Sequence, residues 1–492
     1  MRRPSRAPGL DRLQDTRLFK EFAYLDGSWT ASASGQVIPV TDPGTGAWIG
    51  SVPAWTAAES EAAIGAASRA FPAWSALLPQ ERAKLLRAWF DQMIQHREDL
   101  AVLMTVEQGK PISEARGEID YAASFVEFYA EEAKRTNIES VTSHLPGAAM
   151  TVSRAPMGVA ALITPWNFPS AMITRKAAAA LAAGCTVVIH PSKETPFSAL
   201  ALAELAERAG LPAGVVNIVT GQATEVVPPM TASPLVRVLS FTGSTEIGRL
   251  LYEQSAGTIK SLILELGGHA PYLVFADADL DRAVDAAIGA KFATSGQDCL
   301  AANRILIERP VYEAFAAKFA ERVASLSVGI GLSDPVIGPL INEKAVAKQE
   351  AQISDALARG ASVLTGGGRH AAGPLFFEPT VLGDVPHDAL IFREETFGPI
   401  AALAPFDSEE EAMALANATD YGLVAYLHST DTARIARVSR QLDFGMIAVN
   451  RTKITGAPIP FGGCKQSGLG REGSRLGMEA FMDVKYVCQE VS

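Results

Sequence analysis

Residues 262–304 read LILELGGHAPYLVFADADLDRAVDAAIGAKFATSGQDCLAANR, and the fold and the chemistry of the chain are organised around them. An apolar run carries a glutamate, Glu265, and two glycines, Gly267 and Gly268, follow it closely. A cysteine, Cys299, comes later in a turn that contains Gly296. A thiol and a carboxylate are the two groups that an enzyme needs to form a covalent thio-intermediate and then hydrolyse it.

Glu265 has apolar neighbours on both sides, Leu264 and Leu266. Burying a carboxylate there is costly unless it is solvated, paired or protonated. This cost favours a functional role over the alternative, a carboxylate on a helix surface or a sheet edge. A single cysteine is more often an inert buried thiol, which is our interpretation of Cys185 and Cys488.

Strands and helices alternate on the N-terminal side of this stretch, from residue 158 to residue 265. The expected helices end at glycines, Gly184 and Gly210 among them. Repeated βα units predict a mostly parallel, doubly wound sheet whose ligands lie at the carboxyl ends of the strands. The expected strands of this region are VAALITP, CTVVIHP, VVNIVTG and VRVLSFTG.

The remaining segments predict further parts of the molecule. Residues 22–55 carry alternating runs broken by turn signals, which indicates hairpins. The pattern is helical from Thr56, which has Glu59 three residues later as a capping box, and Pro79 opens a helix that we expect to run to Gly109. Residues 140–155 form two alternating runs around Pro146, typical of a hairpin that projects. A second α/β pattern covers residues 270–460.

These patterns predict the division of the chain into domains. Residues 1–18 are an N-terminal extension, which we expect to be disordered or loosely docked because Pro4, Pro8 and Gly9 interrupt any helix. Residues 19–139 and 156–265 form a cofactor-binding domain, and residues 266–465 form a catalytic domain. Residues 140–155 and 466–492 form an arm and a tail.

Composition limits the partners. A chain of 492 residues with 48% hydrophobic and 20% charged residues is typical of a globular enzyme of two or three domains. Its net charge of -11 argues against nucleic acid, and no apolar run is long enough to span a membrane. Four scattered cysteines favour a reducing, cytoplasmic location and predict no metal site.

The turn FTGSTEIG at residues 241–248 is a candidate phosphate site. Gly243 ends a strand, Ser244 can cap the helix that follows, and the start of a helix offers N–H groups to an anion. The glycine spacing differs from the G-x-G-x-x-G fingerprint, so a plain strand-to-helix turn is the alternative.

The motifs together resemble the NAD(P)-dependent aldehyde dehydrogenases. The resemblance rests on ELGG and GQ-x-C in the opening stretch, TPWNFP at 164–169 and EETFGP at 394–399, and it covers nearly the whole chain. It implies a Rossmann-type cofactor domain, an α/β catalytic domain and a β oligomerisation arm that makes a dimer or tetramer. It also implies that Cys299 is the nucleophile and Glu265 the base for water. Asn167 would hold the oxyanion, where an Asx-turn between two prolines is the alternative.

The resemblance also implies where NAD or NADP binds. The family normally has a lysine at the position of His190, and many NAD-preferring members have a glutamate at the position of Lys193. A lysine tolerates a 2′-phosphate that a carboxylate would repel, so we expect NADP to be tolerated at least. The residues implied to bind the cofactor are Ile163, Thr164, Pro165, Trp166, His190, Ser192, Lys193, Gly221, Phe241, Gly243, Ser244, Leu266, Gly267, Glu395 and Phe397.

Within the family the chain is similar to the succinate-semialdehyde dehydrogenase branch. Arg175 matches the arginine that binds the substrate carboxylate there, and a surface arginine on a helix is the alternative. A second arginine of that branch is replaced by Ala293. We expect Arg451 or Lys453 to supply the missing charge, and Phe461 to line the aldehyde tunnel.

The expected activity is therefore NAD(P)+-dependent oxidation of an aldehyde to the acid, and the expected substrate is a carboxylate-bearing semialdehyde such as succinate semialdehyde. A dehydrogenase for neutral aliphatic or aromatic aldehydes is the alternative, because Ala293 opens the pocket. A CoA-acylating dehydrogenase, a thioesterase and a catalytically silent nucleotide-binding or structural protein are the other candidates. Glu265 argues against the CoA-acylating dehydrogenase, and dependence on a cofactor would exclude the thioesterase. The set Cys299, Glu265 and Asn167 argues against the silent protein.

Overall fold

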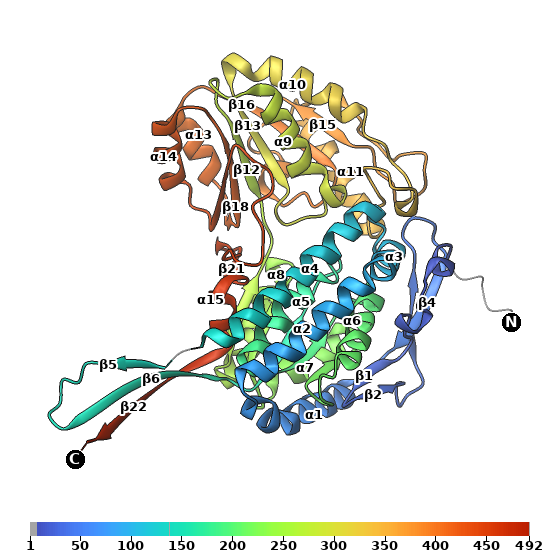
Figure 1. Ribbon diagram of the computed structural model, residues 1–492. Helices are drawn as coiled ribbons and strands as arrows, with labels where there is room; N and C mark the ends of the chain where they lie inside the picture. The colour runs from blue at the N-terminus through green and yellow to red at the C-terminus, as the bar shows by residue number, and fades with distance from the viewer. Residues whose placement is uncertain (1–6, 137, 492) are drawn as a thin grey trace, which may run out of the picture.

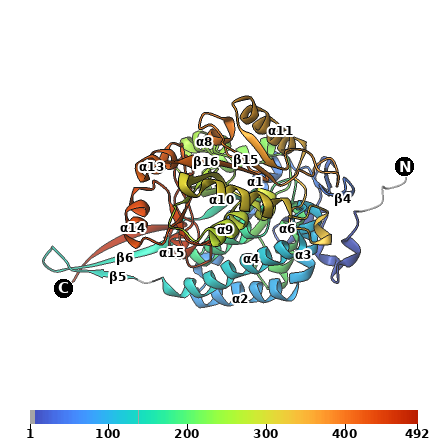
Figure 2. The same cartoon turned by 90° about the horizontal axis from the view of Figure 1, so that it is seen from above.

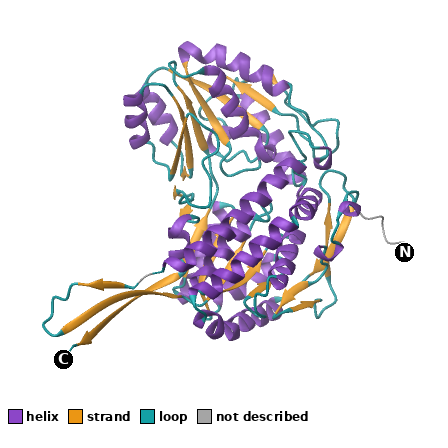
Figure 3. Ribbon diagram, in the orientation of Figure 1, coloured by secondary structure: helices purple, strands orange, loops and turns teal. Residues whose placement is uncertain are grey.

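A computed structural model describes residues 7–136 and 138–491. Figure 1 shows two α/β bodies, one above the other, and a long β arm that leaves the lower body. The chain enters at the lower body, and its C-terminal end lies at the tip of the arm. Figure 3 shows that strands lie inside each body and helices cover them. Residues 1–6 of the predicted N-terminal extension lie outside the described residues.

The lower body contains an eight-stranded sheet in the order β2-β1-β9-β8-β7-β10-β11-β21. Its five central strands run parallel, which confirms the doubly wound sheet. Antiparallel strands close both edges. The bounds are β1 Ala23–Leu25, β2 Ser28–Thr30, β7 Val159–Ile163, β8 Thr186–His190, β9 Val216–Ile218, β10 Val236–Thr242, β11 Ser261–Glu265 and β21 Gly468–Leu469.

Helices cover the two faces of this sheet, and one prediction about them is wrong. The helix expected from Pro79 to Gly109 is two helices, because the chain bends at His96, where φ is -105° and ψ is 19°. Helix α7 was not expected, since Pro228 and Pro229 obscure its pattern. The helices are α1 Ala57–Ala76, α2 Pro79–Gln95, α3 Arg97–Gln108, α4 Ile112–Glu132, α5 Ala171–Ala183, α6 Pro196–Arg208, α7 Ala223–Ala232 and α8 Thr245–Ser255.

The upper body contains a seven-stranded sheet in the order β14-β15-β16-β13-β12-β18-β19, with only β14 antiparallel. Its strands are β12 Ala270–Val274, β13 Ala302–Glu308, β14 Ser362–Thr365, β15 Thr380–Gly383, β16 Ile400–Phe406, β18 Val424–His428 and β19 Met446–Val449. Its helices are α9 Leu280–Phe292, α10 Arg309–Ala324, α11 Glu343–Ala358, α12 Leu390–Arg393, α13 Glu409–Asn417 and α14 Thr432–Gln441. The second α/β pattern of the sequence is therefore confirmed.

The arm is a three-stranded antiparallel sheet in the order β22-β6-β5. Strands β5 Glu139–Val141 and β6 Ala148–Pro156 are the predicted hairpin, and β22 Met482–Glu490 pairs along the full length of β6. Figure 2 shows this sheet extending well beyond both bodies. Helix α15 Ser474–Glu479 precedes β22, and the pairs β3 Val37–Thr41 with β4 Trp48–Pro53 and β17 Tyr421–Gly422 with β20 Cys464–Lys465 complete the strands.

The N-terminal extension is not loosely docked over its described part, residues 7–18. The backbone N–H groups of Gln14 and Asp15 donate to the carboxylate of Asp99 at 2.8 and 2.9 Å. Leu13 and Leu18 are buried in the core of the lower body. The prolines exclude a long helix, but apolar anchors and a buried carboxylate acceptor fix the segment without one.

Candidate active site

Cys299 and Glu265 meet where the two bodies join. Glu265 is the last residue of β11, and Cys299 lies in the turn before β13. The thiol Sγ lies 4.0 Å from Oε1 of Glu265. Gly268 permits this approach, because a Cβ there would lie 2.0 Å from the carbonyl oxygen of Cys299. Residues 262–304 therefore fold so that the thiol of Cys299 lies close to the carboxylate of Glu265.

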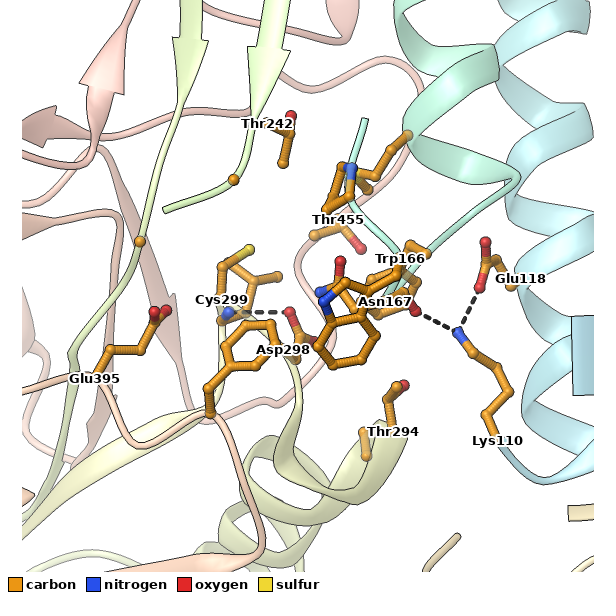
Figure 4. A pocket seen from close by; sticks show the side chains of 18 of the residues that line it. Lys110, Glu118, Trp166, Asn167, Thr242, Thr294, Asp298, Cys299, Glu395 and Thr455 are labelled. Atoms are coloured by element: carbon orange, nitrogen blue, oxygen red, sulfur yellow. Dashed lines mark hydrogen bonds and ion pairs between the residues drawn. The ribbon is translucent and has the colours of Figure 1, made fainter. Parts of the chain in front are cut away.

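Cys299 lines a cavity of about 750 Å³ between the bodies, together with Leu266 and Gly267, the two residues after Glu265. Figure 4 shows Cys299 facing it, with Asp298 next to the cysteine on the same turn. Asn167, Trp166 and Arg175 belong to the lower body and line the same cavity. A reactant in this space therefore has access to groups from both bodies at once. Glu265 itself is buried, with 2% of its surface exposed.

Burial controls the protonation of the pair. It raises the pKa of Glu265 to about 8, and Arg175 only partly opposes this. Burial and the charges of Asp298 and Glu265 raise the pKa of the Cys299 thiol well above its ordinary value. A carboxyl with a raised pKa is suited to take a proton from water near neutral pH. The thiol needs a compensating positive charge nearby to ionise.

Asn167 lies in the loop between β7 and α5 and has 6% of its surface exposed. Its Nδ2 donates to the carbonyl oxygen of Gln297 at 3.0 Å. A primary amide has two N–H donors, so the second remains for an oxyanion beside Cys299. The Gln297 bond also connects the Asn167 loop to the turn of the nucleophile.

Lys110 supports this loop and was missed by the sequence analysis. Its Nζ donates to the backbone oxygen of Asn167 at 2.7 Å and pairs with Glu118 at 2.5 Å, both inside the protein (Figure 4). Glu118 in turn accepts from the backbone N–H of Ser170 at 2.9 Å. Nothing in the sequence marked Lys110, because its partners lie on distant segments and meet only in the fold.

Most of the residues expected to bind the cofactor lie at or just after the carboxyl ends of the parallel strands of the lower body, whereas Glu395 and Phe397 lie before β16 in the upper body. Ile163 ends β7, His190 ends β8, Gly221 follows β9, and Phe241 lies near the end of β10. Thr164 joins two of these ends, because its N–H donates to the backbone oxygen of His190 at 3.1 Å. The members of the predicted set that line the cavity itself are Pro165, Trp166, Gly243, Ser244, Leu266, Gly267, Glu395 and Phe397.

The candidate phosphate turn has the geometry of a helix cap. Ser244 is the N-cap of α8, and its Oγ accepts from the N–H of Ile247 at 3.4 Å. A Cβ on Gly243 would lie 2.3 Å from the ring of Phe241, so the turn has no room for a side chain. The result is an open helix N-terminus beside the cavity, which suits an anion.

His190 is buried, with its Nδ1 3.0 Å from the carbonyl oxygen of Val219. Because a carbonyl only accepts, Nδ1 carries the proton, and burial lowers the pKa of the ring, so it stays neutral. Its other nitrogen is then an acceptor. Lys193 is exposed in the turn that follows β8, and Ser192 in that turn accepts from the N–H of Glu194 at 3.3 Å.

Arg175 is not a surface residue, since only 1% of it is exposed. Its Nε lies 2.6 Å from Glu472 Oε2, and its guanidinium lies 4.0 Å above the ring of Phe461. Lys176 pairs with the same carboxylate. Two cations therefore share one carboxylate, and Arg175 is the member of this cluster that lines the cavity. The Nη1 of Arg175 has no hydrogen-bond partner among residues 7–136 and 138–491.

The two basic residues expected to aid Arg175 are placed differently. Lys453 lies on the cavity wall, close in sequence to Thr455, which also lines it. Arg451 is exposed and does not line the cavity. Two residues along an extended loop are enough to place one side chain on the cavity wall and the other away from it. Of the two, only Lys453 therefore stays a candidate contact for the substrate carboxylate.

Two features concern the described residues as a whole. They contain no group of three or more histidine, cysteine, aspartate or glutamate side chains placed to hold a metal ion. None of their helices is both long and apolar enough to span a membrane.

The two doubly wound sheets and the cavity lined by Cys299 define the class of the protein, an α/β protein with its candidate site between two bodies. A sequence model of the aldehyde dehydrogenase family matches residues 29–487, and the chain belongs to this family. It is accordingly an enzyme that acts on the aldehyde group.

Similar proteins cover nearly the whole chain. A glutarate-semialdehyde dehydrogenase of Pseudomonas aeruginosa is 54% identical over 97% of this chain and 99% of its own. A succinate-semialdehyde dehydrogenase [NADP(+)] of Escherichia coli is 53% identical over 97% of this chain and 99% of its own. A crystal structure of an Escherichia coli NADP-dependent enzyme superposes with a TM-score of 0.97 at 53% identity, covering 97% of this chain and 100% of that one.

Proposed function

We propose that the protein oxidises an aldehyde that also carries a carboxylate, with NAD or NADP as the acceptor. The observation that carries the proposal is the Nη1 of Arg175, a buried guanidinium nitrogen without a hydrogen-bond partner in the described chain, on the wall that also holds Cys299. A guanidinium binds a carboxylate well, and a buried one left without a partner is costly. The similar proteins that act on succinate and glutarate semialdehydes support this substrate class.

The proposed reaction begins at Cys299. Its thiolate attacks the carbonyl carbon, and the resulting oxyanion accepts hydrogen bonds from the free N–H of Asn167 and the backbone N–H of Cys299. The nicotinamide of the cofactor supplies the hydride acceptor when it is bound. Loss of hydride leaves a thioester on Cys299. Glu265 then takes a proton from water, and the hydroxide releases the carboxylic acid and the thiol.

The residues present fit a dinucleotide. The start of α8 at Ser244 would hold the pyrophosphate, and Glu395 and Phe397 would contact the nicotinamide ribose. The acceptor nitrogen of neutral His190 suits a ribose hydroxyl, and exposed Lys193 suits a 2′-phosphate. The E. coli relative named for NADP and a betaine aldehyde dehydrogenase of Staphylococcus aureus solved with NAD+ support both cofactors.

The test is a comparison of initial rates with succinate semialdehyde, glutarate semialdehyde, hexanal and benzaldehyde, each with NAD+ and with NADP+. The expected result is a much larger kcat/KM for the two acids, which Arg175→Gln lowers by about 100-fold, as for the loss of a charged contact of about 2.7 kcal/mol, while the rates with hexanal change little. A preference for neutral aldehydes would favour the alternative function, for which Ala293 is the supporting feature.

We further propose that the protein is cytoplasmic and forms a homo-oligomer through its arm. Four free cysteines suit a reducing compartment. The arm extends beyond both bodies and exposes large apolar side chains, including Val484 and Tyr486. A second copy would cover them, because exposed apolar patches of this kind mark interfaces.

A further inference from the structure

The side chain of Lys110 is a buried cation that holds the loop of Asn167. Its Nζ lies 2.5 Å from Oε2 of Glu118 and donates to the backbone oxygen of Asn167 at 2.7 Å (Figure 4). The same nitrogen lies 4.3 Å from the centre of the Phe168 ring. Each of the two charged side chains has 1% of its surface exposed. Taking two charges out of water is costly, so a buried ion pair is weak evidence for a role in stability, and another role has to be sought.

Glu118 holds the other end of the same loop. Its Oε1 accepts from the backbone N–H groups of Ser170 at 2.9 Å and Ala171 at 3.2 Å, where α5 begins. The ion pair therefore binds the loop at two places, through the carbonyl of Asn167 and through the N–H groups that follow it. A shift of Asn167 would break a hydrogen bond to a buried charge, which is stronger than a bond between neutral groups.

A second set of contacts connects this loop to the turn of the nucleophile. Nδ2 of Asn167 donates to the carbonyl oxygen of Gln297 at 3.0 Å, and Oε1 of Gln297 accepts from the N–H of Ile341 at 3.0 Å. Gly338 packs on Gly109, because a Cβ on Gly338 would lie 2.6 Å from the carbonyl oxygen of Gly109. The contacts therefore close a ring across both bodies, from the end of α3 through the loop and the turn and back to the end of α3.

We propose that Lys110 is a positioning residue for the oxyanion. It fixes the backbone of Asn167 so that the free N–H of the Asn167 side chain points to the oxyanion that forms beside Cys299. This inference rests on the proposed function, in which Asn167 is the oxyanion donor. Such a donor is effective only when it is held in place before the charge develops. Because Glu118 balances the charge of Lys110, the effect of Lys110 passes through the hydrogen bond to Asn167.

A double-mutant cycle tests whether Lys110 acts through Asn167. The quantity measured is the rate of the first turnover, followed as cofactor reduction by stopped flow, with saturating succinate semialdehyde and NADP+. We expect Asn167→Ala to lower this rate about 10²- to 10³-fold, as for the loss of an oxyanion donor. Lys110→Met should lower it about tenfold in the wild type, and less than about twofold when Asn167→Ala is already present. A direct effect of the lysine charge on the oxyanion would persist in that background.

A second variant removes the ion pair without leaving a charge behind. Lys110→Met alone leaves the carboxylate of Glu118 buried and without its cation, which can unfold the chain. Lys110→Met/Glu118→Gln avoids this and keeps a side-chain oxygen for the N–H of Ser170. We expect this double variant to fold, as measured by circular dichroism, and to show the same tenfold loss.

The reactivity of the thiol distinguishes positioning of Asn167 from general damage to the site. The reagent 4,4′-dithiodipyridine reacts at sulfur, so no oxyanion forms on a carbonyl carbon. Its rate at Cys299, obtained by comparison with Cys299→Ala, should change less than about twofold in Lys110→Met, because the turn of the nucleophile keeps its other contacts. A general disturbance of the site would slow this reaction together with the first turnover.

Lys20→Met is the matched control. Like Lys110, Lys20 pairs with a glutamate, Glu204, at 2.7 Å and has its Nζ near an aromatic ring, that of Trp29 at 4.6 Å. It lies outside the set of described residues that line the cavity. The rate of the first turnover should therefore stay within about twofold of the wild type.

The inference is overturned if Lys110→Met and Lys110→Met/Glu118→Gln keep the wild-type rate, if the loss is equally large with and without Asn167, or if the thiol slows in parallel. The proposed function has its own outcomes. If Asn167→Ala slows the first turnover and only the cycle fails, the proposed function stands and the inference fails. If Asn167→Ala has no effect, the oxyanion role of Asn167 fails and the inference fails with it. If no carboxylate-bearing aldehyde is oxidised, the proposed substrate class fails, and the cycle is measured with the neutral aldehyde that is oxidised best.

Discussion

At the scale of single residues, the position of Glu265 predicts how the reaction depends on pH. Burial raises its pKa to about 8, so below that pH most of the carboxyl is protonated and cannot take a proton from water. The steady-state rate should therefore rise about tenfold per pH unit on the acid side and level off above pH 8 or so.

The variant Glu265→Gln separates the two halves of the reaction. It should still form the thioester and reduce one equivalent of cofactor in a rapid burst, while steady-state turnover falls by a factor on the order of 10² to 10⁴, as for loss of a general base. Stopped-flow absorbance of the reduced cofactor measures both phases. A burst that disappears together with turnover would mean that Glu265 is needed for attack by Cys299 instead.

The sequence predicts the residues proposed to carry out the chemistry, but it does not predict the residues that support them. Cys299, Glu265 and Asn167 stand in local motifs, and the fold brings Cys299 and Glu265 together. Glu472 interacts with Lys176 at a separation of 296 residues, so no local pattern connects them. The sequence also could not show which of Arg451 and Lys453 lines the cavity, because both are basic residues of one loop and only the folded loop places Lys453 on the cavity wall.

At the scale of elements, Glu107 connects two helices of the lower body. It lies at the end of α3, and its carboxylate accepts from the N–H groups of Phe197 and Ser198, both at 2.7 Å, in the first turn of α6. A helix N-terminus leaves such N–H groups without partners inside the helix, so Glu107 acts as a cap supplied from a distance.

Replacing this cap should cost stability. Glu107→Ala leaves two buried N–H groups without acceptors, and we expect the free energy of unfolding to fall by about 2–4 kcal/mol. Glu107→Gln keeps one acceptor and should lose about half as much. Denaturant titration of both variants measures the difference, and Glu127→Ala is the control, since Glu127 is half-buried on α4 and pairs with Arg87 at 2.8 Å. Equal losses for the alanine and glutamine variants would show that packing matters at this site and capping does not.

Elements with strong periodicity were predictable, and the exceptions have physical causes. The central strands and α5 have continuous apolar or alanine-rich patterns, and they appear where expected. The break between α2 and α3 at His96 could not be predicted from the sequence, because the residues on both sides are good helix formers. The packing of the folded chain determines where the helix is interrupted. Residues 7–18 are ordered by contacts to α3, which only the folded chain supplies.

At the scale of the whole molecule, the arm determines how copies of the chain can associate. Its strands pair in register so that Val484 lies opposite Arg154, Tyr486 opposite Val152, and Cys488 opposite Met150. Residues directly opposite each other point to the same face, so one face of the arm gathers Val484, Tyr486 and Val152. The other face carries the alternate residues of β22, among them Lys485 and Gln489, and is more polar.

This difference between the faces predicts the effect of charges on assembly. The double variant Val484→Glu/Tyr486→Glu should lower the mass measured by light scattering after size exclusion towards that of a single 52.0 kDa chain, because it would bury charges at the interface. Lys485→Glu/Gln489→Glu adds as many carboxylates to the same strand on the polar face and should keep the mass of the wild type. Circular dichroism should show that both double variants keep the fold of the wild type. If both double variants change the mass equally, the apolar face is not the contact, and the free edge of β22 becomes the candidate for pairing with a second copy.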